Sequence, residues 1–338
     1  MREGYNVAVV GATGVVGSTT LAILDERNFP IKQIYLIASS RSAGEVRDFQ
    51  GKPYIVEDIQ HFDFSKTQIA FFSAGSEVAA EFAPKAAAAG NVVIDKSSYF
   101  RYHPDVPLVV PEVNPDDIVE YHNRNIISNP NCNTIPIVVA VKPLYDAVGI
   151  ARMNVVTYQS VSGSGKAGVD ELVHQTAALL NGRPIKTKVY PQQIAFNVLP
   201  HIDIFQENGY TKEEMKIVWE TQKILNDDSI AINPTAVRVP VFYGHSAAVN
   251  IETQDKLSLK HALELLKKAP GIKVITGKLP YPTPVLNAAG EDAVFVGRLR
   301  EDFSHPNGLN LWVVADNLRK GAALNAVQIA EKLIDSYI

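Results

Sequence analysis

The stretch YNVAVVGATGVVGSTTLAILDER, residues 5–27, decides the fold of the first part of the chain. An apolar run ends in a glycine-rich turn, and apolar residues at helical spacing follow, so the stretch predicts a strand, a tight turn and a helix. Gly11, Gly14 and Gly17 have the spacing G-x-x-G-x-x-G, which lets a bare backbone approach a pyrophosphate at the helix N-terminus. The motif alone is weak, because a glycine-rich turn can also simply connect two elements.

The next predicted strand, residues 31–39, ends where a dinucleotide-binding fold places its ribose contact. No carboxylate stands at that point of the sequence. Instead Ser39, Ser40, Arg41 and Ser42 offer hydroxyl donors and a cation, which suit the 2′-phosphate of NADP, whereas Asp or Glu would suit the free hydroxyl of NAD. The pattern therefore predicts NADP as the cofactor. The alternative is that Arg41 is only a solvated loop residue.

Further strands alternate with helices in the same region. Apolar runs at 68–75, 91–98 and 125–130 predict a doubly wound, parallel α/β sheet of the Rossmann type. Ligands of such sheets bind beyond the carboxyl ends of the strands. Residues 73–75, residues 95–101 and the residues after Ser128 are therefore expected at one crevice, with Cys132 on its rim.

Whole-chain properties exclude several classes of function. The chain has 338 residues, 46% hydrophobic and 20% charged, which suffices for two domains around a large core. A net charge of -4 with interleaved signs provides no basic field for nucleic acid. The sequence starts directly with a strand, and no apolar run approaches membrane-spanning length, so we expect a soluble cytoplasmic protein without a membrane partner.

The chain has one cysteine, Cys132, which can form neither an internal disulfide nor a multi-thiolate metal site, and we expect no metal. It lies in SNPNCNT, just before the apolar run TIPIVVAVKPLYDAV, which predicts a strand-to-helix turn. The amides and the positive end of that helix would favour a thiolate, the nucleophilic form. A lone cysteine can also be inert, but its position at the predicted crevice favours a reactive one.

Two stretches of the second half predict elements that carry polar residues. Residues 153–168 predict a β-branched strand that runs into a glycine and serine loop, which can be an anion site or a plain flexible turn. In residues 210–225, Thr211 is a candidate helix N-cap with Glu214 as its capping-box partner. Glu213 and Lys216 share one side of this helix, where they could simply pair with each other on a solvated face.

Residues 235–252 predict two strands with a turn at Gly244, which would present Arg238 and His245 near the bend. The planar guanidinium of an arginine matches a carboxylate with two parallel hydrogen bonds. A histidine can exchange protons near neutral pH, as acid-base chemistry requires, although any single histidine can be a structural residue. His201 is the more ambiguous histidine of the two.

Three motifs together resemble the aspartate-β-semialdehyde dehydrogenase family: NPNCNT at 129–134, GATGVVG at 11–17 and RVPVFYGHS at 238–246. The resemblance covers essentially the whole chain. The related N-acetyl-glutamyl-phosphate reductases share the architecture but typically have glycine before the cysteine and an aromatic residue after it, so Asn131 and Asn133 favour the aspartyl enzymes. Lys96 departs from the family, which more often has asparagine there.

The resemblance implies two domains. One is a discontinuous dinucleotide-binding domain of residues 1–131 and 317–338, and the other is an α+β catalytic and dimerisation domain of residues 132–316. The resemblance also implies a homodimer or homotetramer.

The implied reaction is the reduction of β-aspartyl phosphate by NADPH to aspartate semialdehyde and inorganic phosphate, through a thioester on Cys132. The implied pathway is the biosynthesis of lysine, threonine, methionine and isoleucine.

The resemblance also implies roles for single residues. Cys132 is the nucleophile and His245 the acid-base residue. Substrate binding is implied for Gln159, Arg238, Glu213 and Asn131, and phosphate binding for Arg101 and Lys216. Cofactor binding is implied for Gly11, Thr13, Gly14, Val15, Val16, Ser39, Arg41, Ser42, Ser73, Ser162, Gly163 and Asn317. The alternatives of another kind are a catalytically silent NADP-binding paralogue and an ordinary alcohol dehydrogenase, which would leave the nucleophile unexplained.

Overall fold

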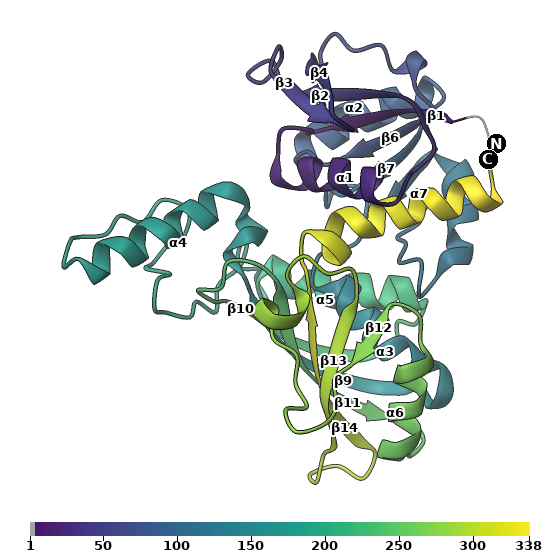
Figure 1. Ribbon diagram of the computed structural model, residues 1–338. Coiled ribbons are helices and arrows are strands. Elements are labelled where there is room, and N and C mark those ends of the chain that lie inside the picture. Colours follow the sequence, from purple (N-terminus) through teal and green to yellow (C-terminus); the bar gives the residue numbers. More distant parts are fainter. Residues whose placement is uncertain (1–3) are drawn as a thin grey trace. The chain divides into compact units, whose positions relative to one another are not determined.

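The computed structural model describes residues 4–338 and divides into two units, each of which is described here by itself (Figure 1). The first unit contains residues up to Asn131 and residues 322–338, and the second contains residues 132–321. Residues 317–321, which we expected in the dinucleotide-binding domain, therefore lie in the second unit. No helix among residues 4–338 has the length and apolar character needed to cross a membrane.

The first unit is built on a six-stranded parallel sheet in the order β5-β2-β1-β6-β7-β8. This confirms the predicted Rossmann-type sheet. The strands are β1 (Tyr5–Val10), β2 (Ile31–Ala38), β5 (Glu57–Asp58), β6 (Ile69–Phe72), β7 (Val92–Asp95) and β8 (Ile126–Ser128). A hairpin of β3 (Val46–Phe49) and β4 (Lys52–Ile55), which the sequence did not suggest, precedes β5.

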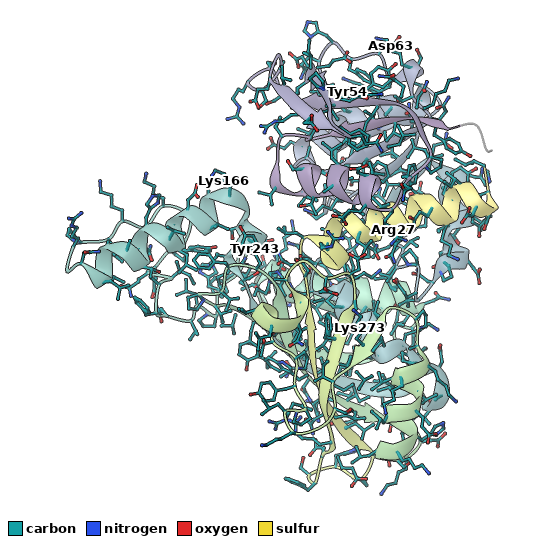
Figure 2. The ribbon with its side chains drawn as sticks, in the orientation of Figure 1. Arg27, Tyr54, Asp63, Lys166, Tyr243 and Lys273 are labelled. Atoms are coloured by element: carbon teal, nitrogen blue, oxygen red, sulfur yellow. The ribbon has the colours of Figure 1, made fainter. Side chains whose placement is uncertain are left out.

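Helices cover both faces of this sheet, because successive residues of the buried strands point to opposite sides. Val7, Val9 and Phe71 pack with α1 (Val15–Glu26) and α7 (Leu324–Ser336) in one apolar cluster. Ala8 and Phe72 pack with α2 (Ser76–Ala88) in a second cluster. The last helix is thus part of the core of the first unit, and the side chain of Arg27, labelled in Figure 2, donates two hydrogen bonds of 2.6 and 2.7 Å to Glu331 on it.

The second unit contains a six-stranded mixed sheet in the order β10-β9-β11-β14-β13-β12. The strands are β9 (Ile150–Gln159), β10 (Ala231–Arg238), β11 (His245–Thr253), β12 (Ile272–Val274), β13 (Val294–Glu301) and β14 (Gly308–Ala315). The helices are α3 (Thr134–Val148), α4 (Gly165–Leu180), α5 (Lys212–Leu225) and α6 (Leu259–Lys268). The expected α+β second domain is confirmed by this sheet and its helices.

One face of the second sheet is covered and the other is open. Residues of β9 and β11 alternate between buried positions such as Met153 and Val249 and more exposed positions such as Asn154 and Tyr158. The buried side chains pack beneath α3, α5 and α6. The alternation is typical of antiparallel strands, here β9, β11, β14 and β13, whose outer face lacks a helical layer.

A helical arm follows β9 and was not predicted. It starts with α4 and continues through an irregular segment to residue 210. Its small core consists of Val161, Leu172, Tyr190, Ile194, Ala195 and Leu199. The buried carboxylate of Glu171 accepts hydrogen bonds from the main-chain amides of Lys188 and Val189, at 2.9 and 2.6 Å, which fastens the irregular segment to α4.

Candidate active site

One edge of the second sheet collects several predicted site residues because four strand ends meet there. The strands β9 and β10 run parallel with Gln159 opposite Arg238, so both strands end at the same level. The antiparallel strand β11 begins at that level with His245, and β14 ends with Ala315 opposite His245. Asn317 therefore follows directly at the same edge.

Cys132 lies immediately before α3, as the sequence predicted, and its side chain is partly buried. The side-chain amide of Asn133, the N-cap residue, lies 3.9 Å from the sulfur through Nδ2. A Cβ atom at Gly321 would lie 3.2 Å from the Cβ atom of Cys132 and 3.1 Å from its carbonyl oxygen, so a larger residue at 321 would press on Cys132.

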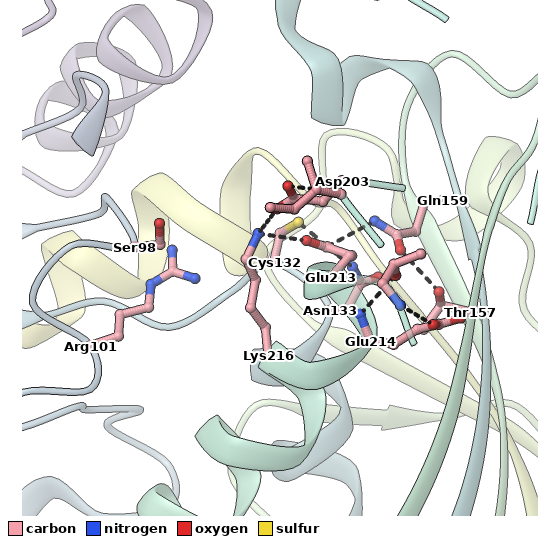
Figure 3. Close-up of polar contacts among 12 residues, drawn as sticks. Ser98, Arg101, Cys132, Asn133, Thr157, Gln159, Asp203, Glu213, Glu214 and Lys216 are labelled. Atoms are coloured by element: carbon pink, nitrogen blue, oxygen red, sulfur yellow. Dashed lines mark hydrogen bonds and ion pairs between the residues drawn. The ribbon is translucent and has the colours of Figure 1, made fainter. Parts of the chain in front are cut away.

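Glu213 connects the cysteine segment with the sheet edge (Figure 3). Its Oε1 accepts a hydrogen bond of 3.0 Å from Nδ2 of Asn133 and one of 3.1 Å from Nε2 of Gln159. Its Oε2 lies 3.0 Å from Nζ of Lys216. Glu213 is only 5% exposed, so it lies inside the unit and not on the solvated helix face that remained possible from the sequence.

Lys216 lies between two carboxylates, with Nζ 2.8 Å from Oδ2 of Asp203 and 3.0 Å from Glu213. Burial favours the neutral amine, but the negative charges of Glu213 and Asp203 outweigh it and raise the pKa of Lys216 above its ordinary value. Lys216 is therefore a cation at physiological pH. The pairing of Glu213 with Lys216, one of the two possibilities from the sequence, is thus present.

The start of α5 explains why Glu213 reaches the sheet edge. The predicted capping box is confirmed: Oγ1 of Thr211 accepts from the amide of Glu214, and the carboxylate of Glu214 accepts from the amide of Thr211 at 2.7 Å. The same carboxylate accepts a hydrogen bond of 2.9 Å from the amide of Ala236 in β10. Glu214 thereby fixes the first turn of α5 against the strand that carries Arg238.

The imidazole of His245 is fully enclosed, with 2% of the residue exposed. Its Nδ1 lies 3.0 Å from the main-chain nitrogen of Ser160, whose N–H donates to it. Its Nε2 is buried and has no hydrogen-bond partner among residues 4–338. An unpartnered nitrogen of this kind is costly unless a ligand completes it, so Nε2 is the point at which a substrate atom is expected.

Burial, with a smaller contribution from the positive charge of Arg238, lowers the pKa of His245 to about 3, and the carboxylate of Glu213 only partly opposes this shift. The ring is therefore neutral at physiological pH. From the sequence we expected His245 to titrate near neutral pH; its pKa is lower because burial disfavours the charged ring.

Arg238 is buried, with 5% of the residue exposed, at the end of β10. Its Nη1 donates a hydrogen bond of 2.8 Å to the carbonyl oxygen of Ser160. Its guanidinium carbon lies 6.0 Å from the centre of the Tyr190 ring, which comes from the helical arm. A buried guanidinium, with its five N–H donors in a planar fork, is suited to an anionic group of a ligand.

Asn317 holds the loop after β9 against the turn before β11. Its Oδ1 accepts hydrogen bonds from the hydroxyls of Ser160 and Ser162, at 3.2 and 3.1 Å, and from the amide of Gly244 at 2.9 Å. Two segments beside the His245 imidazole, the Ser160 segment and the Gly244 turn, are thereby fixed to one side chain.

Gly163 has to be a glycine for the two basic side chains to stay in place. A Cβ atom there would lie 2.9 Å from Nη1 of Arg238 and 3.3 Å from Nε2 of His245. For the activity proposed below, we expect Gly163→Ala to lower kcat/KM by about 100-fold, because displacement of site groups by roughly 1 Å has effects of that size. Steady-state kinetics would measure it. The matched control is Lys166→Ala, which changes an exposed residue in the first turn of α4, close to Gly163 in sequence (Figure 2). Equal rates for both variants would contradict the argument.

In the first unit, the glycine turn has the geometry that the sequence predicted. Gly11 has φ of 81°, and a Cβ atom there would lie 2.7 Å from the carbonyl oxygen of Ser73 at the end of β6. A Cβ atom at Gly17 would lie 2.1 Å from the carbonyl oxygen of Gly11. Gly14 is the N-cap of α1 without a side-chain cap. Thr13, Val15 and Val16 lie at the start of α1, and the main-chain amides of such a first turn are suited to a pyrophosphate.

The loop after β2 is exposed at Ser39, Ser40 and Arg41, while Ser42 is partly buried. The amide of Ser42 donates to the carbonyl of Ser39 at 2.9 Å, which forms a turn. Asp58, aligned with the end of β2, accepts hydrogen bonds from the amide of Gln60 and the hydroxyl of Ser40, and its pKa is lowered. The carboxylate of Asp58 therefore borders this loop, although the sequence of residues 31–42 gave no sign of it.

Two further predicted residues of the first unit are buried. Arg101 is 6% exposed, and its Nη2 donates a hydrogen bond of 2.7 Å to the carbonyl oxygen of Lys96. Asn131 is 6% exposed at the end of this unit, next to Cys132 in sequence.

His201, the histidine whose role was ambiguous from the sequence, belongs to the helical arm of the second unit. Its ring stacks on that of Phe205, with 4.5 Å between the ring centres.

Sequence patterns missed three residues of the second unit that contact the site. Ser160 bonds to both His245 and Arg238, Tyr190 lies under Arg238, and Asp203 pairs with Lys216. Ser160 could have been found, because it directly follows Gln159 at a strand end. Tyr190 and Asp203 lie in the irregular part of the arm, where no periodicity points to them.

Comparisons with known proteins show the family to which the chain belongs. Residues 6–121 match the family model of the semialdehyde dehydrogenase NAD binding domain, and residues 141–320 match that of the semialdehyde dehydrogenase dimerisation domain. The chain is 61% identical to an aspartate-semialdehyde dehydrogenase of Legionella pneumophila, covering 100% of this chain and 98% of the relative. It is 59% identical to aspartate-semialdehyde dehydrogenase 2 of Vibrio cholerae, covering 100% of both.

Solved structures of aspartate-semialdehyde dehydrogenases resemble this chain over nearly its whole length. The crystal structure of aspartate semialdehyde dehydrogenase II of Vibrio cholerae, complexed with ASA, has a TM-score of 0.98 with 58% identity and covers 100% of both chains. A probable aspartate-semialdehyde dehydrogenase of Pseudomonas aeruginosa has a TM-score of 0.95 with 38% identity, covering 99% of this chain and 100% of the other.

Proposed function

We propose that this chain, which belongs to the semialdehyde dehydrogenase family, is an aspartate-semialdehyde dehydrogenase. It interconverts β-aspartyl phosphate and aspartate semialdehyde with a nicotinamide cofactor, as a biosynthetic enzyme for lysine, threonine, methionine and isoleucine. The main support is the position of Cys132 at a helix start in the unit that also holds a buried imidazole with an unpartnered Nε2 and a buried guanidinium. A cysteine that must remain a free thiol suits the reducing cytoplasm.

Cys132 carries the covalent step of the proposed reaction. Its thiolate attacks the acyl carbon of β-aspartyl phosphate, the phosphate leaves, and a thioester remains on the sulfur. Reduction of the thioester gives a thiohemiacetal, which collapses to the aldehyde and releases the thiolate. Bound NADPH supplies the hydride for this reduction. Amide donors near Asn131 stabilise negative charge on the reacting oxygen, and His245 transfers the proton as the acid-base residue.

The remaining charged groups bind the substrate. Arg238 binds the substrate carboxylate with its planar guanidinium, and Gln159 and Glu213 orient the amino acid part, with Glu213 facing the amino group. Lys216 and Arg101 bind the phosphate. Such assignments are supported by the buried, charge-paired state of Glu213 and Lys216, because buried ionised groups outside a binding site are rare.

A side-by-side assay tests the activity. Aspartate semialdehyde with phosphate should yield the reduced cofactor at a rate at least about 100-fold above that with N-acetylglutamate semialdehyde, since a charge-matched site discriminates strongly against a substituted amine. Activity with the acetylated substrate alone would assign the chain to the other enzyme class. Absence of activity with both would leave a silent cofactor-binding protein.

NADP is the proposed cofactor, held by the glycine turn and the first turn of α1, by Ser73, by the loop of Ser39, Arg41 and Ser42, and in the second unit by Ser162, Gly163 and Asn317. We expect Arg41→Ala to raise the KM for NADP by about 10- to 100-fold and to leave the KM for NAD nearly unchanged, because only NADP has the 2′-phosphate. Arg47→Ala, which removes an exposed cation paired with Glu45, is the control. An equal effect on both cofactors would exclude this role of Arg41.

A second copy of the chain is the proposed partner at the open face of the second sheet. Tyr158 and Trp312 are half-exposed there with ring centres 5.4 Å apart, and a groove of about 470 Å³ runs beside Trp312 along Tyr281 and Arg298. The matched dimerisation domain includes this face. Trp312→Glu should shift the sedimentation coefficient toward the monomer at micromolar concentration, because it places a charge in an apolar contact. Val46→Glu, an exposed change in the first unit, should not.

A further inference from the structure

Asp203 is the more weakly held of the two carboxylates that contact Lys216 (Figure 3). Its side chain is 31% exposed, whereas that of Glu213 is 7% exposed. Glu213 also accepts hydrogen bonds from two buried side-chain amides, while Asp203 accepts one further bond, of 2.9 Å, from the main-chain amide of Ile204. Asp203 is therefore the carboxylate that can leave the ammonium group at the smaller cost.

The segment around Asp203 holds this carboxylate against α5. Asp203 has φ of 68°, in the left-handed region that aspartate and asparagine adopt more readily than most residues. The main-chain amide of Lys212 donates a hydrogen bond of 2.7 Å to the carbonyl oxygen of Ile204, so the segment folds back onto the start of the helix. The carboxylate thereby reaches Lys216, in the second turn of α5, from the helical arm.

The ammonium group of Lys216 has little capacity left for another anion. A lysine has three N–H donors, and two of them are directed at Asp203 and Glu213. The side chain is only 11% exposed. A phosphate ion that approaches this group meets two negative charges against one positive charge, which disfavours its binding while both carboxylates stay in place.

We infer that Asp203 is a built-in competitor of phosphate at Lys216, and that phosphate binding displaces the Asp203 carboxylate from the ammonium group. The inference rests on the proposed function for the assignment of phosphate to Lys216. One carboxylate oxygen leaves the N–H donor and one phosphate oxygen takes its place, so no covalent bond changes. Glu213 stays paired with Lys216, because its other hydrogen bonds hold it inside the unit.

The competition sets the affinity for phosphate in both directions of the reaction. In the direction of reduction, phosphate is the first product, and a carboxylate that returns to Lys216 favours its release. In the direction of oxidation, the same carboxylate raises the KM for phosphate above the value that the lysine and Glu213 alone would give. Asp203 contacts neither the reacting carbon nor the cofactor in this account.

Asparagine at position 203 tests the competition. It has the size of aspartate and also adopts the left-handed backbone, so the segment should keep its shape. We expect Asp203→Asn to lower the KM for inorganic phosphate by about five- to tenfold in the oxidation of aspartate semialdehyde, between the effects of an exposed ion pair and of a buried charged hydrogen bond. The KM for aspartate semialdehyde should stay within about twofold of the wild-type value.

Glu207→Gln is the matched control, because it removes an exposed carboxylate from the same segment of the arm. Its KM for phosphate should remain within about twofold of the wild-type value. An unchanged or raised KM for phosphate in Asp203→Asn would overturn the inference, because loss of a residue that merely orients Lys216 weakens phosphate binding. An equal decrease in both variants would also overturn it, since that would be a general effect of net charge.

Thermal unfolding separates this inference from the proposed function, because it needs no turnover. With saturating NADP, inorganic phosphate should raise the thermal midpoint, and half of the rise should need about five- to tenfold less phosphate in Asp203→Asn than in the wild-type protein. If this difference is present but no semialdehyde is oxidised, the proposed function fails. If the wild-type protein is active and the difference is absent, the inference alone fails.

A second variant covers the case in which Asp203→Asn does not fold, as judged by its thermal midpoint without phosphate. Asp203→Gly also removes the carboxylate, and glycine adopts the left-handed backbone without steric cost. We expect the same decrease in the KM for phosphate in this variant, and an unchanged or raised value would overturn the inference.

Discussion

Cys132→Ser lowers phosphate-dependent oxidation of aspartate semialdehyde by about 10⁴-fold or more, because serine keeps the shape of the side chain but loses the nucleophile on which both half-reactions depend. The alcohol of serine has no thiolate-like form near neutral pH. The measurement is the rate of cofactor reduction at saturating substrate. Loss of a covalent nucleophile has effects of this size in other enzymes that form acyl intermediates.

Binding of NADP provides the control for this variant. The glycine turn and the loop after β2 lie in the first unit and do not include residue 132. The dissociation constant of NADP and the thermal midpoint should therefore stay close to those of the wild-type protein. If the serine variant turned over within tenfold of the wild-type rate, the covalent route would be wrong, whatever the cofactor affinity.

Arg238→Lys raises the KM for aspartate semialdehyde by about 100-fold. The planar fork that can hold a carboxylate with two hydrogen bonds is lost, and a charged hydrogen bond contributes about 1.5–3 kcal/mol. Lysine also cannot keep the 2.8 Å bond to the Ser160 carbonyl while it reaches a ligand. The effect should appear mainly in KM, because the carboxylate is remote from the reacting carbon.

Arg152→Lys is the matched control for this change. Arg152 lies in β9 of the same sheet, and its side chain is 47% exposed in a pair with Glu252. An exposed ion pair of this type contributes little, so its KM should remain within about twofold of the wild-type value. If the two variants had the same KM, Arg238 would not be the carboxylate-binding residue.

The sequence predicted the elements that follow strict local rules. The strands of the first unit are buried on both faces and appear as short apolar runs, so β1, β2, β6, β7 and β8 were all predicted. The capping box at Thr211 and the turn at Gly244, which has φ of 84°, were also readable because each depends on one or two residues. Because most of the candidate site residues lie at the ends of these elements, their positions could be predicted as well.

The sequence could not reveal how the site is supported. The bond from Glu214 to Ala236 and the three bonds to Asn317 join residues far apart in the chain, and no spacing pattern encodes them. The pKa of His245 likewise depends on enclosure by the folded unit, so its ordinary value misled the prediction. The helical arm after β9 was not predicted, because its core is small and the sequence of its second part has no regular hydrophobic period.

The position of α7 in the core of the first unit constrains how the protein is made. Val327, Ile329 and Leu333 pack against a sheet whose strands were all synthesised before residue 132. On the ribosome, that sheet must therefore wait with the α7 part of one apolar face uncovered while about 190 further residues emerge. Ribosome-bound chains that stop before residue 322 should consequently recruit holdase chaperones until the last helix leaves the exit tunnel.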